Sequence, residues 1–135
     1  MAIPNGAGGY QLGDGNRNEL RIGYSAAAQT ATSTATLTAA QVTGGVLVAN
    51  PSTSAATYTL PTASEIEAVV TSATAGSTFD LSIVNIGTSS GAVTLSLGTG
   101  ITDGGNATVA IAITSSALFR FRKVSDGAWT LTKVA

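Results

Sequence analysis

The sequence has no histidine and no cysteine, and charged residues make up only 10% of its 135 positions. Histidine is the most frequent general acid or base in enzymes, and cysteine supplies thiol nucleophiles. The same two residues are the main protein ligands of zinc and related metals. Their absence predicts that the protein is not an enzyme and that it has no catalytic residues, no metal site, no cofactor and no small-molecule substrate.

Basic residues are too few for several classes of partner. Six Lys and Arg stand against seven Asp and Glu, which gives a formal net charge of −1. Binding to nucleic acid requires clustered Lys and Arg that neutralise phosphates, and attachment to an anionic membrane has the same requirement. No segment approaches the roughly 18 apolar residues that span a bilayer, and the first residues lack the pattern of a signal peptide. We therefore expect neither nucleic acid nor a membrane as a partner.

Residues 1–24 differ in composition from the rest of the chain. Glycines recur throughout this segment, without a helical or alternating period, which is typical of an extended arm. Apolar and charged side chains are scattered along the arm, and we interpret them as contacts that dock it on another surface; the alternative is a disordered leader. The candidate docking residues are Ile3, Tyr10, Leu12, Arg17, Glu19, Leu20, Arg21, Ile22 and Tyr24.

Residues 25–135 read as one domain built mainly of strands. Apolar residues alternate mainly with polar ones at 79–84 and 93–97, large apolar residues alternate with alanine at 109–113, and turn-forming residues separate these segments. The polar stretch at 85–91 predicts a hairpin between the first two segments. A second hairpin is predicted between 118–124 and 129–134, around Ser125-Asp126-Gly127.

One helix is expected between the strands. Thr62 and Glu65 form a capping-box pattern that predicts a helix start. The helix would present Ile66, Val69 and Val70 on one face and end before Gly76.

Together these patterns predict an all-β fold. The expected architecture is an antiparallel β-sandwich or jelly-roll-like domain of about eight strands with one short helix, preceded by the extended arm. Hydrophobic residues make up 44% of the sequence but aromatic ones only 5%, so the core is expected to consist largely of Val, Ile, Leu and Ala. Such a core buries modest area, which favours subunit association as a further source of stability.

A possible contact patch lies in the predicted strand at 118–124. Arg120 and Arg122 share one face of this strand, and Phe119 and Phe121 share the other. The two arginines either contact an acidic neighbour or form a solvent face balanced by carboxylates of the same subunit. Trp129 follows a tight turn and is expected to pack in the core.

Other motifs have ordinary structural explanations. Asp14-Gly15-Asn16 and the 103–106 stretch lack the run of acidic ligands of a calcium loop and are interpreted as turns. Glu65 and Glu67 stand two positions apart on a helix and point in different directions, which argues against a catalytic carboxylate pair.

Most of the chain resembles small structural proteins of tailed bacteriophages. The stretches IPNGAGGYQLGDGN, LPTASEIEAVV, GSTFDLSIVNIG, VTLSLGTGIT and ALFRFRKVSDGAWTL are similar to those of capsid decoration (cement) proteins and of related head-fibre and tail-fibre domains. The resemblance implies a homotrimeric β-sandwich on the outer capsid surface of the virion, where it bridges major capsid protein subunits. An alternative within the same resemblance is a head-fibre or tail-fibre module that binds host-surface glycans.

Overall fold

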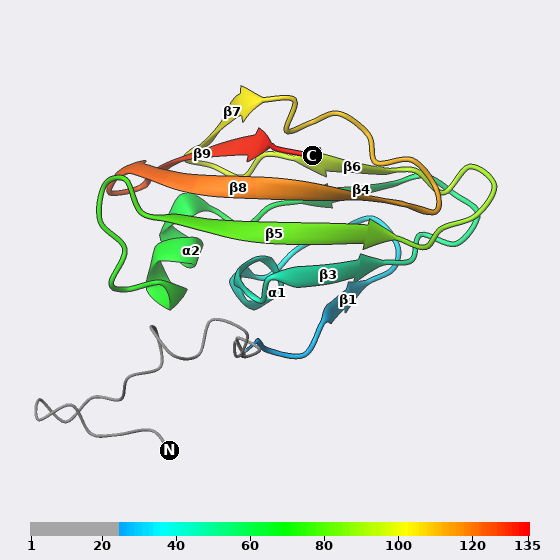
Figure 1. Cartoon of the computed structure of the whole chain (residues 1–135), viewed down its shortest axis with the longest axis horizontal. Helices are drawn as coiled ribbons and strands as arrows, with labels where there is room; N and C mark the ends of the chain where they lie inside the picture. Colours follow the sequence, from blue (N-terminus) through cyan, green and yellow to red (C-terminus); the bar gives the residue numbers. More distant parts are fainter. Residues whose placement is uncertain (1–24) are drawn as a thin grey trace, which may run out of the picture.

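Nine strands and two helices make up residues 25–135, the part of the chain that the computed structural model describes. The predicted arm at residues 1–24 lies outside the described residues. In chain order the elements are β1 (Gln29–Ala31), β2 (Ala35–Thr36), α1 (Ala39–Thr43), β3 (Val46–Ala49), β4 (Ala56–Thr59), α2 (Ala63–Val69), β5 (Thr78–Asn85), β6 (Val93–Ser96), β7 (Ile101–Gly105), β8 (Ser115–Ser125) and β9 (Ala128–Lys133) (Figure 1). The fold is mainly β, as expected.

The strands form two sheets, and in the first half of the domain the chain crosses repeatedly from one sheet to the other. The large sheet has the order β1-β3-β5-β8-β9-β7, and the small sheet has the order β2-β4-β6. From β1 to β6 the chain alternates between them, and every neighbouring pair in this region is parallel. Only β5–β8 and β8–β9 are antiparallel, while β7 pairs with β9 in parallel. The sheets are therefore mixed, and the prediction of a purely antiparallel fold is wrong.

The hairpin predicted around the polar stretch at 85–91, which follows β5, is wrong. This stretch does not close a hairpin, because β5 belongs to the large sheet and β6 to the small one. Alternation of apolar residues reports that one face of a strand is buried, and it carries no information on the direction of the neighbouring strand. The hairpin of β8 and β9 is confirmed. The alternating segment at 109–113 forms only an isolated bridge, between Ile111 and Val93.

Both helices lie where the chain crosses from the small sheet back to the large one (Figure 1). The predicted capping box of Thr62 and Glu65 is confirmed at the start of α2. The helix ends at Val70, before Gly76, and Val69 is 52% exposed, so Val69 does not belong to the buried face. Helix α1, which the sequence reading did not predict, begins with a second capping box, formed by Thr38 and Gln41.

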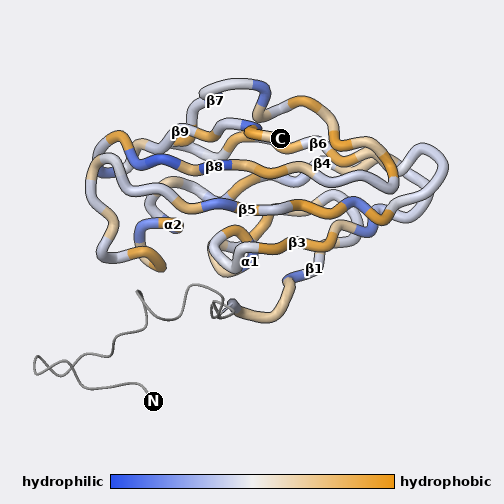
Figure 2. Tube along the Cα trace, viewed as in Figure 1, coloured by the Kyte–Doolittle hydropathy of each residue, from blue (hydrophilic) through white to orange (hydrophobic). Residues whose placement is uncertain are grey.

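The core is one cluster of buried residues that draws on both sheets, for example Leu47 and Phe119 of the large sheet and Tyr58 of the small sheet. Figure 2 shows hydrophilic and hydrophobic stretches along both β5 and β8. Phe79 and Phe121 stack with their ring centroids 4.7 Å apart, and the edge of Trp129 meets Phe79 at 5.6 Å. Trp129 is buried in this aromatic cluster, which confirms its predicted packing role. No helix within residues 25–135 has the length and hydropathy needed to cross a membrane.

Asn85 at the end of β5 holds the crossing to the small sheet in place. Its side chain is buried, and its Nδ2 donates to the carbonyl oxygens of Gly91 at 2.9 Å, Ile111 at 3.1 Å and Ala112 at 3.1 Å. Its Oδ1 accepts a hydrogen bond from the Gly87 amide at 2.8 Å. The side chain thus joins two loops that are distant in sequence, and it provides partners for the Gly87 amide and the Gly91 carbonyl, which belong to buried residues.

Asn85→Ala is expected to lower the free energy of unfolding by about 2–4 kcal/mol, because the substitution leaves buried backbone donors and acceptors without partners. The matched control is Asn50→Ala. Asn50 also follows a strand and accepts from the amide two residues on, but it is exposed. Urea unfolding of both variants at 25 °C tests the expectation. Equal decreases in the free energy of unfolding would show that the buried hydrogen bonds of Asn85 add no more stability than the exposed one of Asn50.

Candidate docking surface

Charged side chains are confined to one part of the domain. In the described residues they lie on the large sheet, on α2 or on the turn after β8, and the strands β2, β4 and β6 carry none. The full set is Glu65, Glu67, Asp80, Asp103, Arg120, Arg122, Lys123, Asp126 and Lys133. Residues 25–64 and 81–102 contain no charged residue at all. The small sheet is therefore electrically neutral along its whole width.

The outer side of the small sheet presents rows of hydroxyl groups. Tyr58 and Leu95 point into the core, so the alternating positions of β4 and β6 face outward. The parallel register places Thr57 beside Thr94, and it aligns Thr36, Thr59 and Ser96 in a second row. We call this surface the hydroxyl face; its members are Thr36, Thr57, Thr59, Thr94 and Ser96.

The hydroxyl face is suited to binding a neutral, hydrogen-bonding partner. Neighbouring strands are about 4.8 Å apart, so the hydroxyls repeat at a regular spacing. Each hydroxyl can donate or accept, and none carries charge that would repel a second copy nearby. The backbone beneath is held in place because the Thr34 hydroxyl accepts from the Thr57 amide at 3.0 Å.

Arg120 and Arg122 lie on the outer side of β8, as predicted, but they differ in their partners. The Arg120 guanidinium donates two hydrogen bonds to the Asp80 carboxylate, at 2.8 and 3.0 Å. These bonds hold the pKa of Asp80 below its ordinary value. Arg122 stands opposite Thr78 and Thr130 and forms no ion pair within residues 25–135. Arg120 is thus balanced by its own subunit, whereas Arg122 is the arginine of this strand available to a neighbour.

Lys123, the third basic residue of β8, points into the protein. Its ammonium group contacts the Asp126 carboxylate at 2.9 Å and Glu67 at 3.3 Å, and it donates to the Ala73 carbonyl at 3.2 Å. Hydrogen bonding to Asp126, followed by Glu67, raises the pKa of Lys123. The alternation Phe119, Phe121, Lys123 is the sequence signal that places this lysine on the inner side.

Glu67 joins α2 to the β8–β9 hairpin. Its carboxylate accepts from the Gly127 amide at 2.9 Å and from the Trp129 indole at 3.2 Å. The Gly127 bond is the largest cause of a lowered Glu67 pKa, with Lys123 and Trp129 adding to it. Glu65, by contrast, bonds to Thr62 at the start of the helix. The two glutamates therefore serve separate structural contacts.

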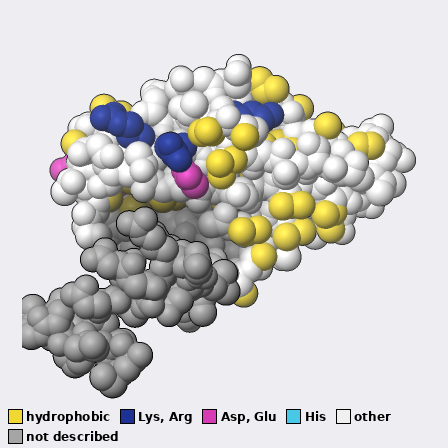
Figure 3. Space-filling view, viewed as in Figure 1, with side chains coloured by type: hydrophobic (Ala, Val, Ile, Leu, Met, Phe, Trp, Pro, Cys, Tyr) yellow, Lys and Arg dark blue, Asp and Glu magenta, His cyan; other side chains and the backbone are white. Residues whose placement is uncertain are grey.

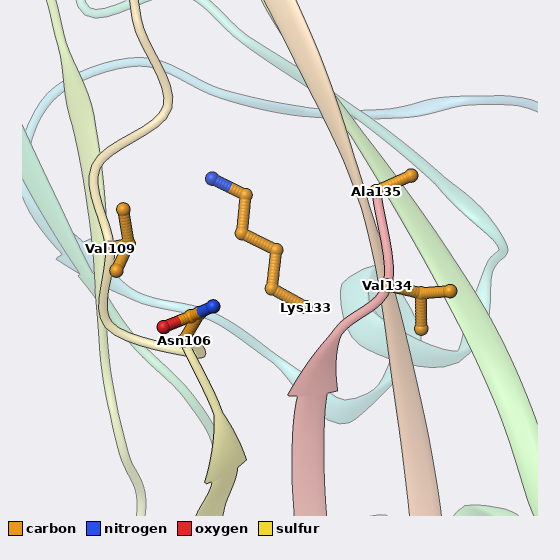
Figure 4. A pocket seen from close by; sticks show the side chains of 5 residues that line it. All are labelled: Asn106, Val109, Lys133, Val134 and Ala135. Carbon is orange, nitrogen blue, oxygen red and sulfur yellow. The ribbon is translucent and has the colours of Figure 1, made fainter.

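A shallow hollow beside the end of β9 has few reactive side chains in its lining. It is lined by Asn106, Val109, Lys133, Val134 and Ala135 (Figure 4). Figure 4 shows the Lys133 side chain extending between the 106–109 segment and the end of the chain. No Asp, Glu, Ser or Thr side chain lines the hollow beside Lys133. Across residues 25–135, no three His, Cys, Asp or Glu side chains gather in a way that could hold a metal.

The candidate docking residues of the arm all precede the described part of the chain. They are Ile3, Tyr10, Leu12, Arg17, Glu19, Leu20, Arg21, Ile22 and Tyr24. The hydroxyl face was not identified from the sequence, although the high Thr and Ser content and the long uncharged stretches were visible there.

Comparison of the chain with family models, with curated proteins and with solved structures gave no match in any of the three. The site therefore has to be interpreted from its own chemistry.

Glu67→Gln is expected to lower the melting temperature at pH 7, because it removes the charge that Lys123 and two N–H donors stabilise. The lowered pKa of Glu67 means that the folded state favours the ionised carboxylate. The stabilisation that this carboxylate gives is therefore fully present above the pKa of an ordinary glutamate, about 4.3, and it is lost as the pH falls through the lower pKa of the folded state. The gap in melting temperature between wild type and variant should therefore narrow from pH 7 to pH 3. A gap that stays constant across this range would assign the effect to packing instead.

Proposed function

We propose that the protein is a structural, non-enzymatic virion protein that binds the assembled phage capsid and stabilises it by bridging major capsid protein subunits. The hydroxyl face carries this proposal, because it is a regular, uncharged surface that fits a repetitive neutral lattice. The likeness of the sequence to capsid decoration proteins supports it. On this proposal the two sheets form a β-sandwich-type module that associates as a homotrimer on the outer capsid surface.

The stabilising mechanism is mass action. A protein that binds the assembled shell but not its separated subunits lowers the free energy of the shell by its binding free energy. Many weak contacts repeated by symmetry add up, so each copy needs only modest affinity. A surface with no charge is favourable here, because neighbouring copies on the lattice do not repel one another through it.

The alternative, an adhesive module that binds host glycans, has less support. Sugar-binding sites commonly use aromatic rings together with polar groups in a concave site. Within the described residues, Tyr58, Phe119, Phe121 and Trp129 are buried and Phe79 is stacked against the core. The aromatic side chains of residues 25–135 are therefore committed to packing.

Thr57→Glu is expected to weaken binding to expanded capsids that lack the protein by at least about tenfold, because it places an unpaired charge in a neutral interface. Thr71→Glu is the control, since Thr71 is also exposed but lies in the segment between α2 and β5, outside the small sheet. Cosedimentation at several protein concentrations measures both affinities. Undiminished binding by the Thr57 variant would rule out the hydroxyl face as the capsid contact.

The two arginines of β8 provide an independent test of the predicted contact patch. Arg122→Ala should weaken capsid binding more than Arg120→Ala, because Asp80 already neutralises Arg120. The effect should diminish as salt is raised from 0.05 to about 0.5 M, where exposed charges are screened. Equal and salt-independent affinities for wild type and both variants would show that neither arginine contacts the capsid.

A further inference from the structure

Apolar side chains gather on one half of the outer side of the large sheet. Val48 of β3 stands beside Val84 of β5, and Ile86 follows on the same side with 48% of its surface exposed. Leu118 of β8 is hydrogen-bonded through its backbone to Val134, which is 50% exposed. With Val46 these residues form what we call the apolar patch: Val46, Val48, Val84, Ile86, Leu118 and Val134.

The rows next to the apolar patch on this surface are polar. Asp80, Arg120 and Arg122 occupy the neighbouring rows of the same side. Figure 3 shows hydrophobic side chains spreading over the sheet on one side of the charged pair. A shallow hollow bordered by Val84, Ile86 and residues 114–116 adjoins the patch at the end of β5. Ser82 lies between Val46 and Leu118, so the patch consists of two neighbouring apolar groups: Val46, Val48, Val84 and Ile86 on one side, and Leu118 and Val134 on the other. A partly exposed apolar surface of this kind marks an interaction site.

The arm lies within reach of this patch. The described chain begins at Ser25, and β1, which starts at Gln29, is the strand next to β3. A fully extended chain advances about 3.3 Å per residue, so the five positions from Ser25 back to Leu20 span up to about 17 Å. Strands are about 4.8 Å apart, and β3 and β5 are the first and second strands from β1. Residues 20–24 are therefore long enough to lie across β3 and β5, which carry the larger group of the apolar patch.

The sequence of this part of the arm matches such a surface. Leu20, Ile22 and Tyr24 alternate with Arg21 and Gly23. In an extended chain, alternate side chains point to the same side, so the three apolar groups can face the sheet together while Arg21 faces solvent.

The edge of the large sheet at β1 is poorly suited to binding the arm as an added strand. Strand β1 has only three residues, and its carbonyl groups are engaged on both sides. The Ala31 carbonyl accepts from the Asn50 amide at 2.8 Å, and the Thr30 carbonyl accepts from the Gln41 side chain at 2.8 Å. An added strand would find no free carbonyl at Thr30, so the face of the sheet is the better surface for the arm.

We propose that Leu20, Ile22 and Tyr24 pack on the apolar patch of their own chain. The connection through residues 25–28 keeps these side chains at a high effective concentration beside the patch, which favours the same chain over a second copy. The segment at 20–24 then anchors the arm, and the part that contains Ile3, Tyr10 and Leu12 remains for contact with a partner. This inference does not depend on the proposed capsid function.

The absence of native cysteine allows a direct test by disulfide trapping. The double variants Ile22→Cys/Val84→Cys and Ile22→Cys/Ser116→Cys place one thiol in the arm and one at the patch. Ser116 stands opposite Val84 and is exposed, so its substitution serves if the Val84 variant folds poorly. The control is Ile22→Cys/Thr57→Cys, whose second thiol lies on the hydroxyl face. The full-length proteins are oxidised at low concentration without capsids and analysed on non-reducing gels and by peptide mass.

The expected result is an intrachain disulfide that forms at least about tenfold faster in a patch variant than in the control. Three results would overturn the proposal: disulfides formed mainly between chains, which would assign the patch to a second copy; equal rates in patch and control variants; and no disulfide at either patch position. Because no capsid is present, none of these results bears on the hydroxyl face.

Discussion

The fold depends on satisfying backbone polar groups each time the chain passes from one sheet to the other. Buried amides and carbonyls at such crossings have no ladder partner, and leaving one unpaired costs about as much as losing a hydrogen bond. At one end of the molecule the crossings are built from capped helices, in which Thr38 and Thr62 pair with Gln41 and Glu65. At the opposite end Asn85 bonds to the loop that follows β5 and to the loop that precedes β8. The core itself is made largely of small aliphatic residues, so these polar contacts fix the path of the chain between the sheets.

The alternation of side chains revealed which residues are buried, but it did not reveal which strands are neighbours. The β8–β9 hairpin was predictable because a tight turn at Ser125-Asp126-Gly127 leaves the chain only one way to return. The polar stretch after β5 looked similar in sequence, yet it crosses between sheets because Asn85 is buried at its start. Helix α1 has only five residues, within a run of Thr and Ala that favours strands as much as helices. At the polar stretch after β5, long-range contacts of Asn85 therefore outweighed the local signal, whereas at α1 the local signal was itself ambiguous.

The candidate surfaces were predictable to a similar extent. Arg120 and Arg122 were placed on the correct side of their strand, since a two-residue period fixes the side directly. The partner of Arg120 was not predictable, because Asp80 is forty positions away and meets it only through the pairing of β5 with β8. The same limit applies to the hydroxyl face. Its residues are visible in the sequence, but their alignment into rows arises from the parallel register of three strands that are separated along the chain.

The edges of both sheets restrict how this domain can associate. Strand β2 has two residues, β1 has three, and the Thr30 carbonyl of β1 is already bonded to Gln41. Strand β7 contains a bulge, where the Asp103 carboxylate accepts from the amides of Gly105 and Ala107. The outer side of β6 is bridged to Ile111. Short, bulged or covered edges prevent strand-to-strand association between copies. Partners must therefore bind through the faces of the sheets, and the two faces differ sharply: one is uncharged and rich in hydroxyls, and the other is divided between ionic and apolar halves. On the proposed function the uncharged face binds the capsid, and on the further proposal only the apolar half of the divided face holds the chain's own arm, which leaves Arg122 on the ionic half exposed.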